Sequence, residues 1–386
     1  MTAWIRSIVP PERLASIQAF SGRHRSTTVI VVMFIVSVVL FFWSDYPPFS
    51  LFQPHNAWIG GFVNAGVLIL LAMGLNVVIG MAGLLDLGYA AFFAIGAYFY
   101  AFGASPFTGL HLPFLLLLFL GAICAALFGI VLGAPTLRLR GDYLAIVTLG
   151  FGEIVPILFL NLDRYTQGTN GITGVDRPNI LGVQFPGIDQ TLYFVLMAVV
   201  VTITMILLYR VQSSRLGRAW MAIREDELAA AANGINTVTT KLLAFAIGAT
   251  TAGFAGVLNA SKLTIVDPSQ FLFTVSFTVA TVIVLGGMGN IWGVAVAAFL
   301  IYMIQSVVLK QLTGFFDVVP IPILTDINFV QFQFLLFGIA LVLMMLFRPE
   351  GLFPERRRAR ELHEGTDADG GDGANVDEDV LVEART

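Results

Sequence analysis

Long apolar runs separated by short polar connections constrain this chain more than any other feature. Each run approaches the roughly 20 residues that an α-helix needs to cross the hydrocarbon core of a bilayer. The chain is 57% hydrophobic and only 12% charged, whereas soluble domains average about 25% charged residues. We therefore predict an all-α, polytopic integral membrane protein with about ten transmembrane helices. The predicted spans are residues 27–43, 57–79, 84–104, 112–133, 143–161, 190–209, 241–260, 271–288, 291–309 and 327–347.

Composition divides the chain into three regions. Residues 1–26 form a polar N-terminal segment, and residues 27–347 hold the spans and form the predicted transmembrane domain. Residues 348–386 begin as a basic stretch and continue as a tail rich in Gly, Asp and Glu. Such a tail has too little apolar surface to fold, so we expect it to be disordered.

The distribution of arginine predicts an orientation. Arginines gather before the first span, between the fourth and fifth, within the connection 210–240, and after the last span. Short loops rich in Lys and Arg stay in the cytoplasm, and ten spans place all four groups on that side. We therefore expect both termini to be cytoplasmic. Near Met81 and Met288 a re-entrant segment could replace a turn, which would change the count.

Two glycine clusters interrupt the apolar runs in the two halves of the chain. Residues 74–98 and 282–300 each place glycines between an apolar run and a helix rich in small residues. Paired, Gly-interrupted segments often mark the pathway of a transporter. The alternative is close helix packing through glycine. From the first cluster we take Asn76, Gly80 and Gly83 as candidate pathway residues.

Two carboxylates lie within or beside predicted spans. Glu153 lies in the fifth span, with Gly150 and Gly152 before it and Pro156 after it. An acidic residue at that depth is costly unless it faces a cavity or a partner, so it is a candidate for the pathway. Equally, Glu153 could lie near the outer end of the span and bond a neighbouring helix. Asp86 is a pathway candidate too, or else the N-cap of the third span.

The predicted cytoplasmic connection contains a helix that is too polar to span the membrane. Ala, Leu and Glu in residues 218–235 favour a helix, and Gly234 is a natural stop. A short charged helix of this kind could anchor to the membrane surface or dock a cytoplasmic partner. The candidate docking residues are Arg224, Glu225, Asp226, Glu227, Ala229, Ala230 and Gly234.

Catalytic and metal chemistry find little support. None of the lysines follows a glycine, so a GxxxxGK[ST] loop is absent. The histidines are scattered without metal-ligand spacing, and none lies in a span to act as a base. The one cysteine, Cys124, cannot form an intrachain disulfide. We expect no catalytic residues, no metal site and no bound cofactor.

Several ordered motifs resemble one family of transporters. The stretch Glu227, Ala229, Ala230 and Gly234, with Leu228 inserted, resembles the coupling segment of ABC importer permeases. Four further motifs together resemble the permease subunits of high-affinity branched-chain amino acid ABC importers, over residues 57 to 354. They are the glycine cluster 80–88, RLRGDYLAIVTLGFGE at 138–153, GTNGITG at 168–174 and LGGMGNIWG at 285–293.

The resemblance implies a heteromeric importer in the cytoplasmic (inner) membrane. An extracytoplasmic binding protein would deliver leucine, isoleucine or valine to a pore formed with a homologous second permease. Two cytoplasmic ATPase subunits would hydrolyse the ATP. We expect no nucleic-acid partner. Three alternatives stay open: a urea or short-chain amide permease of the same family, a proton-coupled secondary transporter with Glu153 or Asp86 carrying protons, and a passive channel.

Overall fold

The structure, a computed structural model, describes the helical part of the chain with a few gaps. The N-terminal segment up to residue 24 and the acidic tail lie outside it, as do Arg138 and Arg140. The described residues are 25–43, 55–136, 142–180, 182–187, 189–309, 332–348 and 351–353.

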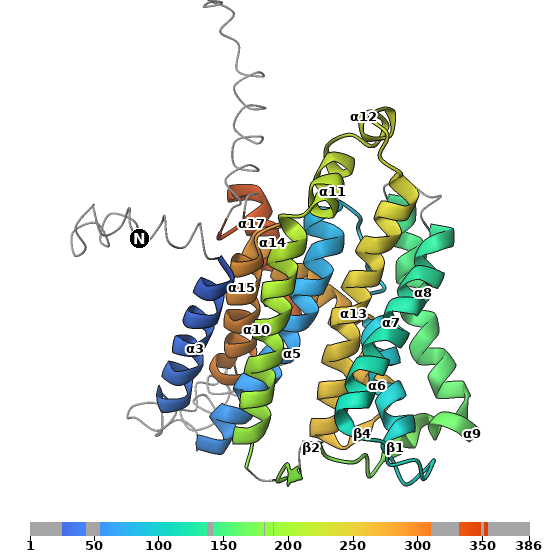
Figure 1. Cartoon of the computed structure of the whole chain (residues 1–386), viewed down its shortest axis with the longest axis vertical. Helices are drawn as coiled ribbons and strands as arrows, with labels where there is room; N and C mark the ends of the chain where they lie inside the picture. The colour runs from blue at the N-terminus through green and yellow to red at the C-terminus, as the bar shows by residue number, and fades with distance from the viewer. Residues whose placement is uncertain are drawn as a thin grey trace, which may run out of the picture.

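Apolar helices form nearly all of the described structure (Figure 1). In the described residues, 6 helices are long and apolar enough to cross a membrane. They are α7 (Phe114–Thr136), α8 (Asp142–Asn161), α10 (Thr191–Gln212), α13 (Thr237–Leu263), the segment Ala57–Met81 that contains most of α5 (His55–Asn76), and the segment Pro268–Gly286 that ends with α14 (Phe273–Gly286). Shorter apolar segments are Thr28–Phe42 within α3 (Arg25–Trp43), α6 (Ala90–Gly103), Ile291–Ser306 beginning with α15 (Ile291–Met303), and α17 (Gln333–Phe347). A helical, polytopic membrane protein is thus confirmed in outline, and the count of ten spans stays a prediction.

Helix α13 is the centre of the packing and contacts α5, α6 and α7 (Figure 1). Small residues allow the close approach. A Cβ added at Gly96 of α6 would lie 2.5 Å from the carbonyl oxygen of Gly253 in α13, and one added at Gly129 of α7 would lie 2.7 Å from the Cβ of Ala249. Lipid gives helices no hydrophobic reason to associate, so this backbone proximity supplies the van der Waals contact that holds them together.

The first glycine cluster unwinds the chain between two helices. α5 continues as a π-helix, η1 (Val77–Met81), in which the Ala82 N–H donates to the Val77 carbonyl at 3.1 Å. Residues 82–89 are then irregular, and α6 begins only at Ala90. The predicted third span, 84–104, was therefore wrong at its start. Gly83 has φ of 70°, a left-handed conformation that a helix cannot accommodate and that glycine adopts readily.

The second glycine cluster forms the turn between α14 and α15. Gly287 and Gly289 have φ of 102° and 90°. Asn290 then caps α15, because its side chain accepts a hydrogen bond from the Gly293 N–H. α15 passes into a second π-helix, η4 (Ile304–Val308).

Small polar elements lie at the two ends of the helices. At one end are α11 (Arg215–Glu225) and α12 (Glu227–Ala232). Figure 1 places the short strands and α9 at the opposite end. These are α9 (Asp163–Thr166), η2 (Gly168–Asn170), β1 (Ile172–Thr173) paired antiparallel with β4 (Ile265–Val266), β2 (Asn179–Ile180) paired with β3 (Val183–Gln184), and η3 (Pro268–Phe271).

Candidate functional site

The two glycine clusters, far apart in the sequence, touch at the end of the molecule that carries α11 and α12. The Gly289 N–H donates to Asn76 Oδ1 at 2.9 Å. A Cβ added at Gly80 would lie 2.5 Å from the Gly289 nitrogen and 2.2 Å from Asn76 Oδ1. Only glycine fits there without displacing the backbone of the other cluster. The structure thus joins Asn76 and Gly80 and adds Gly289, and we call these three residues the break contact.

Helix α11 reaches into the break contact through Arg224. Its Nη1 donates to the carbonyl oxygen of Gly80, which belongs to the π-helix where regular i→i−4 bonding is lost. A Cβ added at Gly83 would lie 2.6 Å from Arg224 Cγ, so the arginine stem packs directly on the unwound chain. On the other side, Gln212 Nε2 donates to the Gly289 carbonyl at 3.1 Å. A predicted docking residue is therefore bonded to a predicted pathway residue.

Asp86 lies deeper, in the irregular segment between η1 and α6. The residue is 1% exposed, and its Oδ1 accepts from the Gly88 N–H at 2.9 Å. Its Oδ2 is buried without a hydrogen-bond partner among the described residues. The N-cap alternative is wrong, because the N-cap of α6 is Tyr89 and the Ala90 N–H donates to Ser276 Oγ of α14.

Glycines of α8 differ in what they face. A Cβ added at Gly152 would lie 2.8 Å from the Cα of Gly88, so α8 presses on the irregular segment through this residue. Thr148, one turn earlier on the same face, accepts a hydrogen bond from the Leu87 N–H at 3.1 Å. A Cβ added at Gly150 would meet nothing within 4 Å. The structure therefore brings Gly152 to the segment that holds Asp86 and leaves Gly150 outside it.

Glu153 also points away from that segment. It is half-buried and makes no hydrogen bond or ion pair with the described residues. Helical spacing puts it on the face that carries Ile146 and Ile157, whose side chains are exposed. The site is near the middle of α8 rather than at its outer end. Glu153 thus lies on an uncovered face of a helix that can span the membrane.

The docking segment is two helices rather than the single one that we expected. Asp226 separates them and caps α12, accepting from Leu228 N–H and Ala229 N–H at 2.8 and 3.0 Å. An aspartate at this position competes with the continuing helix for backbone donors, which explains the kink. Gly234, with φ of 82°, follows the end of α12, where a stop was predicted.

Not every predicted docking residue is accessible on α12. Glu227 forms an ion pair with Lys241 of α13 at 2.6 Å, and Ala230 is buried. These two residues hold α12 against the membrane helices. Leu228, by contrast, is 69% exposed, and Glu225, Asp226 and Ala229 are exposed beside it. The inserted leucine that departs from the family pattern is the large apolar side chain that α12 presents.

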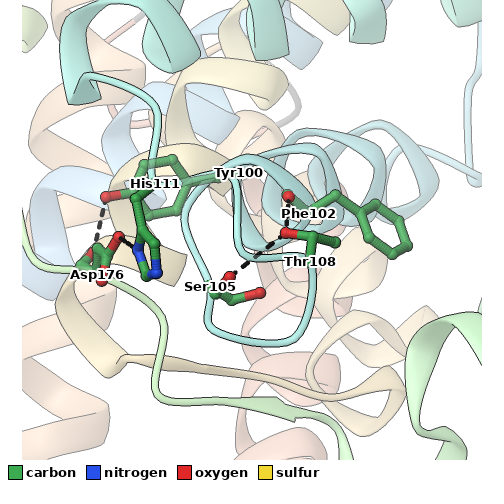
Figure 2. Close-up of polar contacts among 6 residues, drawn as sticks. All are labelled: Tyr100, Phe102, Ser105, Thr108, His111 and Asp176. Carbon is green, nitrogen blue, oxygen red and sulfur yellow. Dashed lines mark hydrogen bonds and ion pairs between the residues drawn. The ribbon is translucent and has the colours of Figure 1, made fainter.

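A cavity of about 570 Å³ lies at the opposite end, beside the strands. Figure 2 shows two contacts among the residues that line it: His111 Nδ1 lies 2.5 Å from Asp176 Oδ2, and the Tyr100 hydroxyl donates to the Asp176 carbonyl at 2.8 Å. Arg177 and Asn179 complete its polar wall. These contacts connect α6 and the loop after it to the segment after β1, and they hold one wall of the cavity in place.

Sequence reasoning missed several polar residues that the structure places inside. Ser276, Thr148 and Lys262 each bond groups distant in the chain. Lys262 could have been singled out from the sequence, because a lysine in the last turn of an apolar helix is unusual. Ser276 and Thr148 could not, because serine and threonine are common in such helices. Within the described residues, no group of three or more His, Cys, Asp or Glu side chains could hold a metal ion.

Comparison with known proteins identifies the family. Residues 58–347 match the family described as branched-chain amino acid transport system / permease component. The permease protein LivM of the high-affinity branched-chain amino acid transport system is 40% identical over 320 residues in Salmonella typhimurium and in Escherichia coli, covering 78% of this chain and 70% of each relative. The LivH permease of the same system in Salmonella typhimurium is 28% identical over 269 residues, which are 66% of this chain and 86% of LivH. No solved structure matches the chain.

These matches cover most of the apolar helices, both glycine clusters and the α11–α12 segment. The relatives are transport permeases, and the family is not one of catalytic enzymes. The chain belongs to the family of permease components of branched-chain amino acid transport systems.

Proposed function

We propose that this chain is the membrane-spanning subunit of an ABC importer that moves leucine, isoleucine and valine into the cell. The observation that carries the proposal is the bond from Arg224 of α11 to the Gly80 carbonyl. It links an exposed docking segment to the place where a spanning helix unwinds. ATP would be hydrolysed by two separate ATPase subunits, and this chain would bind no cofactor and catalyse no reaction itself.

In this mechanism, an ATPase subunit holds α12 through Leu228 and its exposed neighbours. Movement of the ATPase displaces α12 and, through the Glu227–Lys241 ion pair, the start of α13. α11 moves with it, and Arg224 transmits the displacement to Gly80 and the irregular segment that follows. A π-helix followed by unwound chain is easier to rearrange than regular helix. Alternating access then follows from two positions of this segment.

A second, homologous permease would complete the pathway. Glu153 lies half-buried on a face of α8 that is otherwise aliphatic and exposed. A carboxylate facing lipid is costly, so such residues normally face a cavity or another protein segment. Covering this face with a second permease places Glu153 at a shared pathway, where it could meet the ammonium group of an amino acid. The LivH name among the relatives supports a second permease.

The arrangement also supports ten spans in the cytoplasmic membrane with both termini on the ATPase side. The segment after α17 contacts the turn after α14, because Asn290 Nδ2 donates a hydrogen bond to the Phe353 carbonyl at 2.9 Å. The same turn contains Gly289 of the break contact, at the end of the molecule with α11. The first residues of α3 lie toward the same end (Figure 1). An extracytoplasmic binding protein would then approach the end with the strands and the cavity at His111.

Reconstitution of the purified complex tests the function. We expect the chain to co-purify with a second permease and an ATPase pair. In proteoliposomes, leucine uptake should require both ATP and the loaded binding protein. Glu153→Gln at an unchanged protein level should reduce uptake, and normal transport by this variant would remove Glu153 from the pathway.

Each alternative predicts a different result in the same vesicles. Uptake that collapses with a protonophore and survives without ATP would favour a proton-coupled secondary transporter. ATP-independent flux would favour a channel. ATP-dependent uptake of urea or short-chain amides, without uptake of leucine, would favour the amide branch of the family.

A further inference from the structure

A partly buried lysine near the end of α13 has no carboxylate partner among the described residues. Lys262 Nζ donates to the Gly60 carbonyl at 2.8 Å and to Asn64 Oδ1 at 2.6 Å. Both acceptors are neutral. An ammonium group carries three donors, so these contacts leave one donor unassigned, and no described residue places a negative charge beside it.

A second buried lysine on the same helix gives the contrast. Lys241, at the opposite end of α13, is paired with the Glu227 carboxylate at 2.6 Å. A buried cation in a membrane protein is normally paired in this way, because an unpaired charge is costly to bury. The C-terminus of α13 offers Lys262 roughly half an elementary charge of opposite sign, which is less than a carboxylate supplies.

The surroundings of Lys262 are fixed by three helices. Asn64 of α5 accepts from Lys262 through Oδ1 and donates through Nδ2 to the Tyr302 hydroxyl of α15 at 2.9 Å. This chain of bonds fixes the orientation of the Asn64 amide and therefore the direction of the ammonium group. Since α5 starts and α13 ends here, the cluster lies at the end of the molecule opposite α12 (Figure 1).

We propose that Lys262 binds the carboxylate of the transported amino acid as it enters from the side opposite the ATPase. The described contacts use two of the three ammonium donors, and the carboxylate that every α-amino acid carries would supply a third acceptor and the opposite charge. The proposal rests on the proposed function, because it assigns the substrate of that pathway. Lys262 supplies the charge, whereas Asn64 and Tyr302 position it.

Asn64→Asp gives the sharpest test, because it places a carboxylate where the amide now contacts the ammonium group. The internal carboxylate should compete with that of the substrate. In the reconstituted complex we expect leucine uptake to fall by about tenfold or more, the size expected when a buried charge partner is lost, while the thermal midpoint stays equal or rises. A purely structural lysine predicts that the new ion pair keeps both stability and uptake. Wild-type uptake in a stable Asn64→Asp protein would overturn the proposal.

A chemical readout covers the case in which Asn64→Asp unfolds more easily. Cys124 is the only cysteine of the chain, so Cys124→Ala combined with Lys262→Cys leaves one thiol at the site. Alkylation with 2-bromoethylamine rebuilds an ammonium group of lysine length and should restore uptake. Alkylation with 2-bromoethanol, which adds a neutral hydroxyl group of similar length, should not restore it.

The two assays separate this proposal from the function on which it rests. Equal uptake after alkylation with 2-bromoethylamine and with 2-bromoethanol would overturn the assignment of Lys262 while wild-type uptake stood. If the wild-type complex did not import leucine at all, the proposed function would fail first.

Discussion

Two glycines of α8, two residues apart, have opposite structural roles. Gly152 packs on the backbone of Gly88, whereas Gly150 faces open space. Gly152→Ala should therefore lower the free energy of unfolding by about 1–3 kcal/mol, the usual cost of overpacking. Gly150→Ala should leave it unchanged or raise it by up to about 1 kcal/mol, because alanine favours helix. Thermal unfolding of the two purified variants in detergent checks the pair; equal midpoints would contradict the packing of α8 on the irregular segment.

Arg224 makes the most direct single-residue test of transmission. Arg224→Gln shortens the side chain and leaves the Gly80 carbonyl without its charged donor, a loss of about 1–3 kcal/mol for a buried acceptor. We expect ATP hydrolysis to continue while leucine uptake falls at least about fivefold. The reason is that movement of the ATPase subunits would no longer be transmitted to the break contact. The measurement is the ratio of uptake to ATP hydrolysed in proteoliposomes.

The same helix supplies a matched control for that variant. Arg218 is exposed and donates to the Ser213 carbonyl at 3.0 Å, away from the glycine clusters. Arg218→Gln should preserve the ratio of uptake to hydrolysis. A ratio that stayed normal in Arg224→Gln, or fell equally in both variants, would show that this arginine does not couple the two processes.

Among the elements, α12 carries the prediction for the ATPase contact. Leu228 is the large apolar side chain that this helix exposes, and burying a leucine stabilises a contact by about 1.5–3 kcal/mol. Leu228→Asp should weaken binding of the ATPase subunits by about 10- to 100-fold, measured by how much ATPase co-purifies. Val183→Asp, at an exposed position on the opposite end, serves as the control. Retention of the ATPase by Leu228→Asp would place the docking surface elsewhere.

The elements also show what the sequence could and could not predict. Apolar runs located the helices, because their length and composition directly reflect the bilayer. The start of α6 was missed, since residues 84–89 are apolar enough for a span, and hydropathy does not register that Gly83 packs on the Arg224 side chain and Gly88 on the Thr148 backbone. The kink at Asp226 was missed because alanine-rich neighbours favoured one continuous helix. The partners of Gly80 and the exposure of the α8 face with Glu153 depend on which helix faces which, and a single sequence holds little of that information.

At the scale of the whole molecule, the halves of the chain meet through their glycine clusters. Gly289 bonds Asn76, and Arg224 bonds Gly80, so three separate parts of the sequence converge at the end with α11 and α12. Lys262 lies at the other end of the same helices, α5 and α13. A change of position at the break contact would therefore act on the two helices that hold Lys262, and this connects the proposed ATPase side to the proposed entry side.

The orientation that this requires can be tested with single cysteines in a Cys124→Ala background. Exposed positions exist at both ends: Leu228 and Phe353 at the end with α11, and Phe107 and Val183 at the end with the strands. If both termini are cytoplasmic, a membrane-impermeant maleimide should label Phe107→Cys and Val183→Cys in intact cells. It should label Leu228→Cys and Phe353→Cys only after permeabilisation, because they lie on the ATPase side. Labelling of Leu228→Cys in intact cells would reverse the topology, and opposite results for Leu228→Cys and Phe353→Cys would require an odd number of spans between them.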